Sequence, residues 1–409
     1  MVQAMLAGVA SIRAQQTRMN VIGNNLANVN TTAYKSSRIT FQEMMAQTLR
    51  GASGPSGTLG GRNAFQYGLG VQVGATDTNV EQGSLQATNR PTDLAIQGNG
   101  YFVVSDGAGL SYTRDGAMSL DANGDLVHSS TGQRMVGWSA SQTTGVIDTS
   151  QPIGASNFIN IPLGLRTTVQ ETSKGVFNGN LNSSAAVGTT TESTVEMFDS
   201  LGNMHSVKFA FTKSATNQWT WAASGGGAGA TVNGTGTIDF GPNGSVTGGG
   251  TGSVSITPVG ANPMTVSTDF SKVSQLNNPS SIQGLTDGTP AGSLDRFTIG
   301  SDGVITGLYS NGLSRPIAQI TTATFQNTNG LERLGSNLWR QTPNSGSVEL
   351  GEPTVDGRGA VVAGFLEQSN VDIGQEFTDL IITQRGFQAN TKIVTTVDEM
   401  LQDLIGMKR

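Results

Sequence analysis

The chain has 409 residues, of which 36% are hydrophobic and only 13% charged, and it contains 56 glycines. This length allows two to four domains, and the low charge argues against a disordered chain. The formal net charge of −6, with no cluster of Lys and Arg, excludes the electrostatic footprint of a nucleic-acid-binding protein. Because there is no cysteine, disulfides, thiolate metal sites and cysteine nucleophiles are excluded as well.

Residues 1–30 are predicted to form one N-terminal helix. Apolar side chains recur every seven residues, with Val2 and Val9 in companion positions, at Met5, Ile12, Met19 and Leu26. A seven-residue apolar repeat makes a stripe that must be buried against another helix. Asparagines, which favour caps and turns, then end the pattern at Asn24, Asn25, Asn28 and Asn30.

The first 42 residues carry four bases and no acid, which is also typical of an organelle transit peptide. The regular heptad favours a structural helix instead. No apolar run approaches the length of a membrane span, and the start lacks the uninterrupted apolar core of a signal peptide.

Residues 31–70 are expected to be a connecting segment. A short amphipathic piece runs from Phe41 to Leu49, and a Gly- and Ser-rich stretch follows from Gly51 to Gly61. This composition is typical of a flexible segment or a long loop.

Residues 71–145 alternate apolar and turn residues, as in an all-β domain. Strand-like runs at 94–96 and 101–104 flank Asn99-Gly100 and predict a hairpin there, and Asn123-Gly124 predicts a second turn. The same style returns at 285–365, so these two stretches are expected to form one discontinuous inner β domain.

Residues 146–284 are expected to form an inserted outer β domain. They contain two Gly triplets, and Trp219 and Trp221 are spaced two apart, as on one face of a strand.

The C-terminal part, residues 366–409, is predicted to form a second helix from about 372 to 407. Its apolar heptad consists of Ile373, Leu380, Phe387, Val394 and Leu401. Since no similar helix lies between them, the two terminal helices are expected to pair as a coiled coil. The predicted fold is therefore mainly β and multidomain, with nested β domains and paired N- and C-terminal α-helices.

No catalytic, cofactor or metal site is expected. The glycines of residues 68–74 miss the spacing of a dinucleotide loop, and Asp121, Asn123 and Asp125 match only part of a calcium loop. His128 and His205 lie far apart and have no second ligand nearby in sequence, so a solvent-facing or hydrogen-bonded role is expected for each.

Several stretches together resemble the bacterial flagellar rod and hook protein family. Residues 24–35 (NNLANVNTTAYK) are similar to its N-terminal signature, and residues 92–104 (TDLAIQGNGYFVV) to the start of its β domain. The C-terminal QSNVD (368–372), Glu376-Phe377 and ITQRGFQAN (382–390) resemble its end. In the middle, FDSLGNMH (198–205), Phe209 to Lys213 and Trp219 resemble the outer domain of the hook members rather than the shorter rod members.

The resemblance implies a self-polymer: a curved tube that transmits motor torque, with terminal helices inside and β domains outside. It implies five kinds of partner: other copies of the chain, the rod at the proximal end, a hook cap during assembly, hook–filament junction proteins at the distal end, and the flagellar export apparatus. It places the protein in the hook and basal body, outside the cell after type III export.

The sequence leaves three alternatives open. A rod protein of the same family shares the motifs, a secreted β-rich adhesin would explain the Gly/Thr/Asn-rich middle, and an enzyme would need converging acid–base groups.

Overall fold

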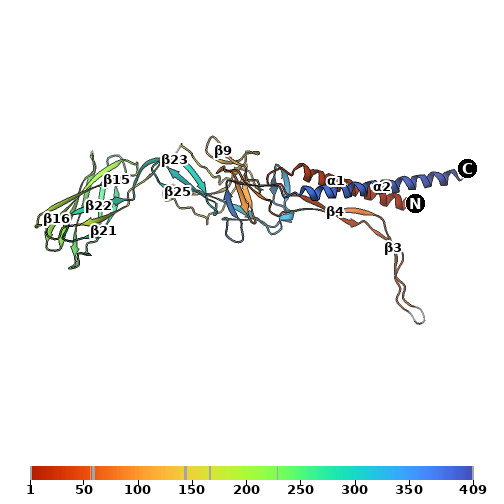
Figure 1. Ribbon diagram of the computed structural model, residues 1–409, viewed down its shortest axis with the longest axis horizontal. Helices are drawn as coiled ribbons and strands as arrows, with labels where there is room; N and C mark the ends of the chain where they lie inside the picture. Colours follow the sequence, from red (N-terminus) through yellow and green to blue (C-terminus); the bar gives the residue numbers. More distant parts are fainter. Residues whose placement is uncertain are drawn as a thin grey trace. The chain divides into compact units, whose positions relative to one another are not determined.

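The computed structural model describes residues 2–55, 57, 60–141, 145–164, 167–227 and 229–407 (Figure 1). The chain falls into two compact units. The first comprises Met1–Ile161, Thr298–Ile305 and Pro316–Arg409, and the second comprises Pro162–Phe297 and Thr306–Arg315. The chain crosses the division between residues 161 and 162, and again in β23 (Thr289–Ile299), β24 (Val304–Tyr309) and β25 (Ser314–Ile320).

The first unit contains the two long helices, α1 (Val2–Ala27) and α2 (Ile373–Gly406), which lie side by side and antiparallel (Figure 1). The Asp372 carboxylate caps α2 by accepting from the backbone N–H groups of Gly374 and Gln375, at 2.8 and 3.1 Å. At the end of α1, the Asn28 side chain donates to the Asn24 carbonyl, 2.9 Å away. The predicted mainly β fold with paired terminal helices is therefore confirmed.

The main sheet of the first unit contains nine strands. Its hydrogen-bonded path runs through β27 (Glu332–Gly335), β28 (Leu338–Arg340), β8 (Leu110–Thr113), β7 (Tyr101–Ser105), β11 (Arg134–Met135), β10 (Leu126–His128) and β9 (Met118–Leu120). Off this path, β26 (Thr322–Thr324) pairs with β7 and with β29 (Glu349–Gly351), and the short 3-10 helix η1 (Thr328–Gly330) follows β26. In the same unit, β12 (Gly137–Ser139) pairs with residues 318–320 of β25.

The first unit also contains four smaller antiparallel pairs. They are β1 (Ser37–Glu43) with β4 (Val71–Thr78), β2 (Ala46–Arg50) with β3 (Phe65–Gly68), β5 (Leu85–Ala87) with β31 (Phe365–Glu367), and β6 (Leu94–Gln97) with β30 (Ala360–Ala363). Most of the amphipathic piece from Phe41 to Leu49 therefore lies in strands. Three residues of the Gly/Ser-rich stretch, 56, 58 and 59, lie outside the described residues.

The hairpin predicted around Asn99-Gly100 is wrong, because β6 pairs with β30 and not with β7. Strand β7 is already hydrogen-bonded to β8, β11 and β26, so neither of its edges is free for β6. Gly98 and Gly100, with φ of 110° and 127°, let the chain leave one sheet and enter the other. The second predicted turn is confirmed, since β9 and β10 pair across Gly124, whose φ is 85°.

The second unit is built on another nine-stranded sheet. Its path runs through β15 (Thr190–Phe198), β16 (Met204–Ala215), β17 (Gln218–Gly225), β18 (Thr231–Phe240), β20 (Thr251–Thr257), β21 (Met264–Ser274), β14 (Lys174–Asn180) and β22 (Ser281–Thr286), with β19 (Val246–Gly248) on β18. Strands β15 and β22, at the two ends of the path, contact each other. In the same unit, β13 (Thr167–Gln170) pairs with residues 289–293 of β23.

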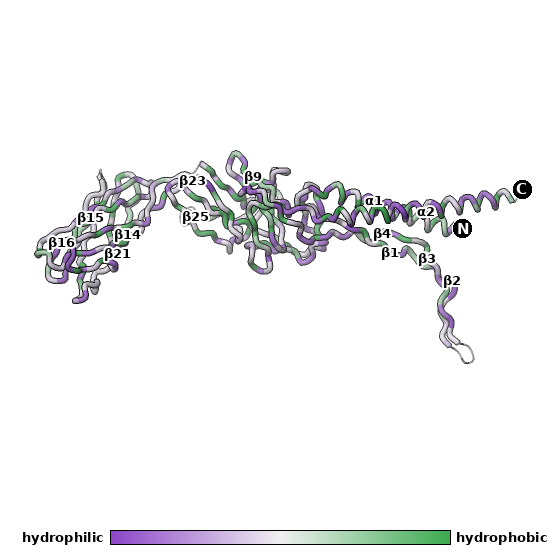
Figure 2. Tube along the Cα trace, in the orientation of Figure 1, coloured by the Kyte–Doolittle hydropathy of each residue, from purple (hydrophilic) through white to green (hydrophobic). Residues whose placement is uncertain are grey.

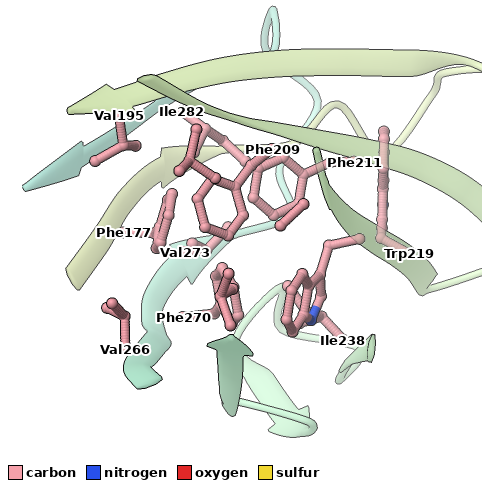
Figure 3. Close-up of a cluster of buried hydrophobic side chains, with 14 of the residues drawn as sticks. Phe177, Val195, Phe209, Phe211, Trp219, Ile238, Val266, Phe270, Val273 and Ile282 are labelled. Atoms are coloured by element: carbon pink, nitrogen blue, oxygen red, sulfur yellow. The ribbon is translucent and has the colours of Figure 1, made fainter. Parts of the chain in front are cut away.

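Strict alternation builds the core of this unit. In β16 every second side chain from His205 to Lys213 is buried, which is the period of a strand with one face on a core. Phe177, Phe209 and Phe270 pack together in this core, with ring centroids 4.6 and 4.9 Å from that of Phe177 (Figure 3). Trp219 and Trp221 are both buried from the same strand, as their spacing predicted.

Candidate assembly interface

Figure 2 shows that apolar and polar residues are mixed along both paired helices. Eight of the nine predicted residues are half-buried: Met5, Ile12, Met19, Leu26, Leu380, Phe387, Val394 and Leu401. Ile373 is exposed, with 48% of its surface accessible. Val9 is half-buried, and the side chain of Val2 lies outside the described residues.

The contacts between α1 and α2 are more polar than the heptads suggested. Asn390 Nδ2 donates to Ser11 Oγ at 2.7 Å, and the Arg18 guanidinium lies 3.0 Å from the Asp379 carboxylate. Each such hydrogen bond contributes about 0.5–1.5 kcal/mol net, and a pair as exposed as Arg18–Asp379 contributes less. These contacts set the register of the helices more than they add to stability.

Close approach of the helices depends on glycine. A Cβ added to Gly8 would lie 3.2 Å from Val394 Cγ2, and one added to Gly386 would lie 3.2 Å from Gln15 Nε2. Both distances are tighter than ordinary van der Waals contact, so larger side chains at these positions would push the helices apart.

The sequence prediction missed the second line of positions in the α2 heptad. Thr383, Asn390 and Val397 each follow a predicted residue by three, and Thr383 and Val397 are buried. Heptad spacing could have found them, because residues three and four apart share a helix face. Two of the three are polar, however, so a search for apolar residues passed over them.

Asn25 connects the helix pair to the β structure and is 1% exposed. Its Nδ2 donates to the Ser37 carbonyl and to Glu376, each at 2.8 Å, and its Oδ1 accepts from Ser37 N and from the Tyr34 hydroxyl. All the usual hydrogen-bonding capacity of the amide is thus used. Burial raises the pKa of Glu376, and the hydrogen bond from Asn25 opposes this rise.

A buried ionic cluster lies in the same junction. Lys35 Nζ lies 2.6 Å from Glu367 Oε1, with side-chain exposures of 1% and 0%, and Arg114 Nη1 lies 3.4 Å from Glu367 Oε2. Lys35 also donates to the Glu81 carbonyl at 2.7 Å, and Gly83 N donates to Glu367 at 2.9 Å. Burial lowers the pKa of Lys35, against the attraction of Glu367. Lys35 and Arg114 thus each have the Glu367 carboxylate as a counter-charge, which offsets the cost of burying them.

Three of the motifs quoted from the sequence meet in this junction. Lys35 comes from the 24–35 motif, and the Ile96 carbonyl, which accepts from Arg114, comes from the 92–104 motif. Asn370, from the 368–372 motif, accepts from Ser36 N at 2.8 Å and donates to the carbonyls of Asn79 and Glu81. These three motifs therefore supply residues to the contact between the helix pair and the β strands of the first unit.

Both histidines are hydrogen-bonded, which is one of the two roles expected for them from the sequence. In the second unit, His205 Nδ1 donates to the Gly226 carbonyl at 2.7 Å, and Nε2 lies 3.0 Å from the Asp199 carboxylate. Both partners are acceptors, so the doubly protonated ring satisfies them best. Burial alone would lower the pKa of His205, but the hydrogen bonds to Asp199 and Gly226 outweigh it and the pKa is raised. In the first unit, His128 is fully buried and its Nδ1 lies 2.9 Å from the Thr131 hydroxyl.

Within the described ranges, no group of three or more His, Asp or Glu side chains is placed to hold a metal ion. In the same part of the chain, neither helix is long and apolar enough to cross a membrane.

Family profiles cover both ends and much of the middle. Residues 5–35 match "Flagella basal body rod protein", residues 95–175 "Flagellar hook protein FlgE/F/G D1 domain", residues 176–288 "Flagellar basal body protein FlaE D2 domain" and residues 362–407 "Flagellar basal body rod FlgEFG protein C-terminal". The first profile covers most of α1 and the last covers all of α2, and the second and third together cover residues 95–288 of the β structure.

Whole-chain relatives agree with this pattern. The chain is 34% identical to flagellar hook protein FlgE of Borreliella burgdorferi and 36% identical to FlgE of Treponema pallidum, each over 100% of both chains. It is 30% identical to flagellar basal-body rod protein FlgG of Bacillus subtilis, also over 100% of both. The fold and its terminal helix pair are therefore those of a flagellar axial protein. Within that class, the chain belongs to the flagellar hook protein family.

Proposed function

We propose that this chain polymerises through its terminal helices into a curved tube that acts as a universal joint between motor and filament. The protein is a structural subunit of the flagellar hook and is located in the flagellum. The observation that carries the proposal is the full-length match to hook proteins together with the antiparallel pairing of α1 and α2.

The nine heptad residues are proposed to stabilise the inner layer of this tube. Pairing within one chain leaves much of α2 uncovered, since Ile373, Phe377 and Ile381 are 48%, 48% and 58% exposed. Covering a Leu- or Ile-sized side chain completely contributes about 1.5–3 kcal/mol, so a few such contacts between neighbouring copies outweigh many exposed ion pairs.

The division of labour along the chain is part of the proposal. Residues 1–30 and 366–409 would supply the inner helices, residues 31–70 the connection, and residues 71–145 with 285–365 the inner β domain. Residues 146–284 would supply the outer domain. The small polar side chains and glycines of this outer region give its surface few strong anchors, which suits sliding between neighbours in a bending tube.

The finer partners follow from the family and remain proposals: the rod below, a cap during growth, junction proteins above, and the flagellar export apparatus. The role is structural, and we propose no catalytic activity. A rod role is the nearest alternative, supported by the 30% identity to the B. subtilis rod protein. Bent tubes rather than straight ones, seen by electron microscopy, favour the hook.

The decisive experiment is polymerisation of the purified chain, raised in concentration with salt and imaged by electron microscopy. Leu380→Asp would bury a charge in the inner layer at a cost of several kcal/mol and should abolish tubes while both β regions stay folded. Gln375→Asp is the matched control, because Gln375 is exposed and lies five residues before Leu380, on another face of the same helix, and this variant should still polymerise. Tubes of ordinary length from Leu380→Asp would overturn the terminal-helix model.

A further inference from the structure

We propose that the hairpin formed by β2 and β3 binds the C-terminal end of α2 from a second copy of this chain. We call residues 398–407 the α2 tail. The inference rests on the proposed function, because a polymer supplies the second copy. It adds a specific head-to-tail contact between two surfaces that the single chain leaves uncovered.

The hairpin has no core of its own. Among the residues that the structure describes, β2 pairs only with β3, and every residue from 41 to 50 is exposed. Leu49 and Phe65 are 57% and 56% exposed. Phe65 and Tyr67 are two apart in β3 and therefore share a face. Tyr67 lies opposite Gln47, and Phe65 lies opposite Arg50 across a register shift that takes in Leu49, so Leu49 and Arg50 both lie beside Phe65. An isolated two-stranded hairpin is marginally stable in water, so this face calls for a partner.

The α2 tail extends past the start of α1. Ser11 contacts Asn390, and Gly8 lies against Val394, which fixes the antiparallel register. Val2, the first residue of α1, lies six residues before Gly8, and Met400 lies six residues after Val394, so Met400 is level with the start of α1. Helix α2 continues for six more residues, to Gly406. About 9 Å of helix therefore projects beyond its partner, at 1.5 Å per residue.

The surface of the α2 tail is both apolar and acidic. Met400 and Met407 are 46% and 84% exposed. Helical periodicity places Met400, Asp403 and Met407 on one face, since they are spaced i, i+3 and i+7. Asp398 and Glu399 lie in the first turn of the tail, which contains no base, although Lys408 and Arg409 follow it outside the described residues.

The hairpin has the opposite charge. Residues 44–68 include Arg50 and Arg62 and no acid. Within the part of the chain that the structure describes, neither arginine has an ion-pair partner, and neither do the three acids of the α2 tail. On the hairpin, the apolar side chains Leu49 and Phe65 lie in a segment whose charged residues are bases. On the α2 tail, Met400 and Met407 lie in a segment whose described charged residues are acids. These two surfaces are complementary, which favours a second copy over an unrelated partner.

The chain's own α2 tail is not bonded to this hairpin. Among the described residues, no hydrogen bond or ion pair joins α2 to β2 or β3. The hairpin is held instead at the start of α1, where Gln3 Nε2 donates to the Tyr67 hydroxyl at 2.7 Å. Phe65 and Leu49 lie nearer the tip of the hairpin than Tyr67 does, so they are farther from this contact with α1.

Cross-linking between copies tests the contact directly, and the absence of native cysteine makes every disulfide assignable. Leu49→Cys chains and isotope-labelled Met407→Cys chains are polymerised together and oxidised, and linked peptides are identified by mass spectrometry. We expect a 49–407 link between labelled and unlabelled chains in the polymer. Val259→Cys, 75% exposed in the second unit, replaces Leu49→Cys in the control and should not link to position 407.

A charge exchange provides the second arm. Asp403→Arg should raise the critical concentration for polymerisation about two- to fivefold, the range of an exposed ion pair, and adding Arg50→Glu should restore it. Gln402→Arg, on another face of the helix, is the control and should have a smaller effect that Arg50→Glu does not reverse.

Tubes that form without the 49–407 link, or a defect that Arg50→Glu fails to rescue, would overturn the docking and leave the proposed function intact. Failure of the unsubstituted chain to form tubes would overturn both.

Discussion

Replacing Glu367 with Gln tests whether the buried ionic cluster holds the helix pair to the β strands of the first unit. The substitution keeps the size of the side chain and removes its charge. It leaves Lys35, 2.6 Å away, and Arg114, 3.4 Å away, without their counter-charge in a site where the side-chain exposures are 1% and 6%.

The expected cost follows from this burial. Removing one partner of a buried pair costs about 3–5 kcal/mol, because the remaining charge stays desolvated and uncompensated. Glu192→Gln is the matched control: Lys208 and Glu192 are 2.7 Å apart, but their side chains are 47% and 52% exposed. An exposed pair contributes about 0.2–1 kcal/mol, so nearly equal distances should give very different losses.

Hydrogen exchange measured by mass spectrometry reads each segment separately, which matters because a chain of two units need not unfold in one step. Exchange at residues 33–36 and 365–368 should accelerate at least about 100-fold in Glu367→Gln, since each 1.4 kcal/mol is a factor of ten. In Glu192→Gln the change around β15 and β16 should be about fivefold or less. Comparable, small changes in both variants would refute the assignment of the cluster as the joint.

Three further predictions concern the helix pair and the second unit. Gly8→Leu should separate the helices and accelerate hydrogen exchange in α2. Gly23→Ala should instead stabilise α1 by about 0.5–1 kcal/mol, because no atom lies within 4 Å of the added Cβ. Circular dichroism and hydrogen exchange measure both effects. Because the pKa of His205 is raised, its contribution to stability is complete below about pH 6.5 and is lost as pH rises through the folded-state pKa; thermal unfolding of the second unit should show this slope, and His205→Gln should remove it. Since Ser173 Oγ donates to Asp287 at 2.6 Å, residues 174–286 can be replaced by a short Gly-Ser turn, and the shortened chain should polymerise into tubes without regular curvature; unchanged curvature in electron micrographs would show that this region does not select the bend.

Local periodicity by itself predicted much of the architecture. Seven-residue repeats predicted both helices, because a helix places residues three and four apart on one face whatever lies elsewhere in the chain. Alternation around Trp219 and the Asn123-Gly124 turn predicted β elements for the same reason, since strand period and turn chemistry are local.

The helix contacts could be predicted only in part. Apolar residues such as Leu380 and Phe387 marked one line of the stripe, but Thr383 and Asn390 mark the other. A polar residue at a heptad position is ambiguous in a sequence, because it is equally suited to solvent. Only the facing helix, which supplies Ser11 to Asn390, shows that this position is part of the contact.

Pairing between distant segments was decided by the tertiary structure alone. The Asn99-Gly100 turn predicts a hairpin, yet β6 joins β30 because β7 is already bonded along both edges. Lys35 is likewise an ordinary base in the sequence, and Glu367, 332 positions away, makes it part of a buried joint. Periodicity and turn chemistry act over a few residues, so they can be recognised in the sequence directly. Strand partners and buried charge pairs depend on which distant segments compete for the same strand edge or buried site. That competition is resolved only when the whole chain packs.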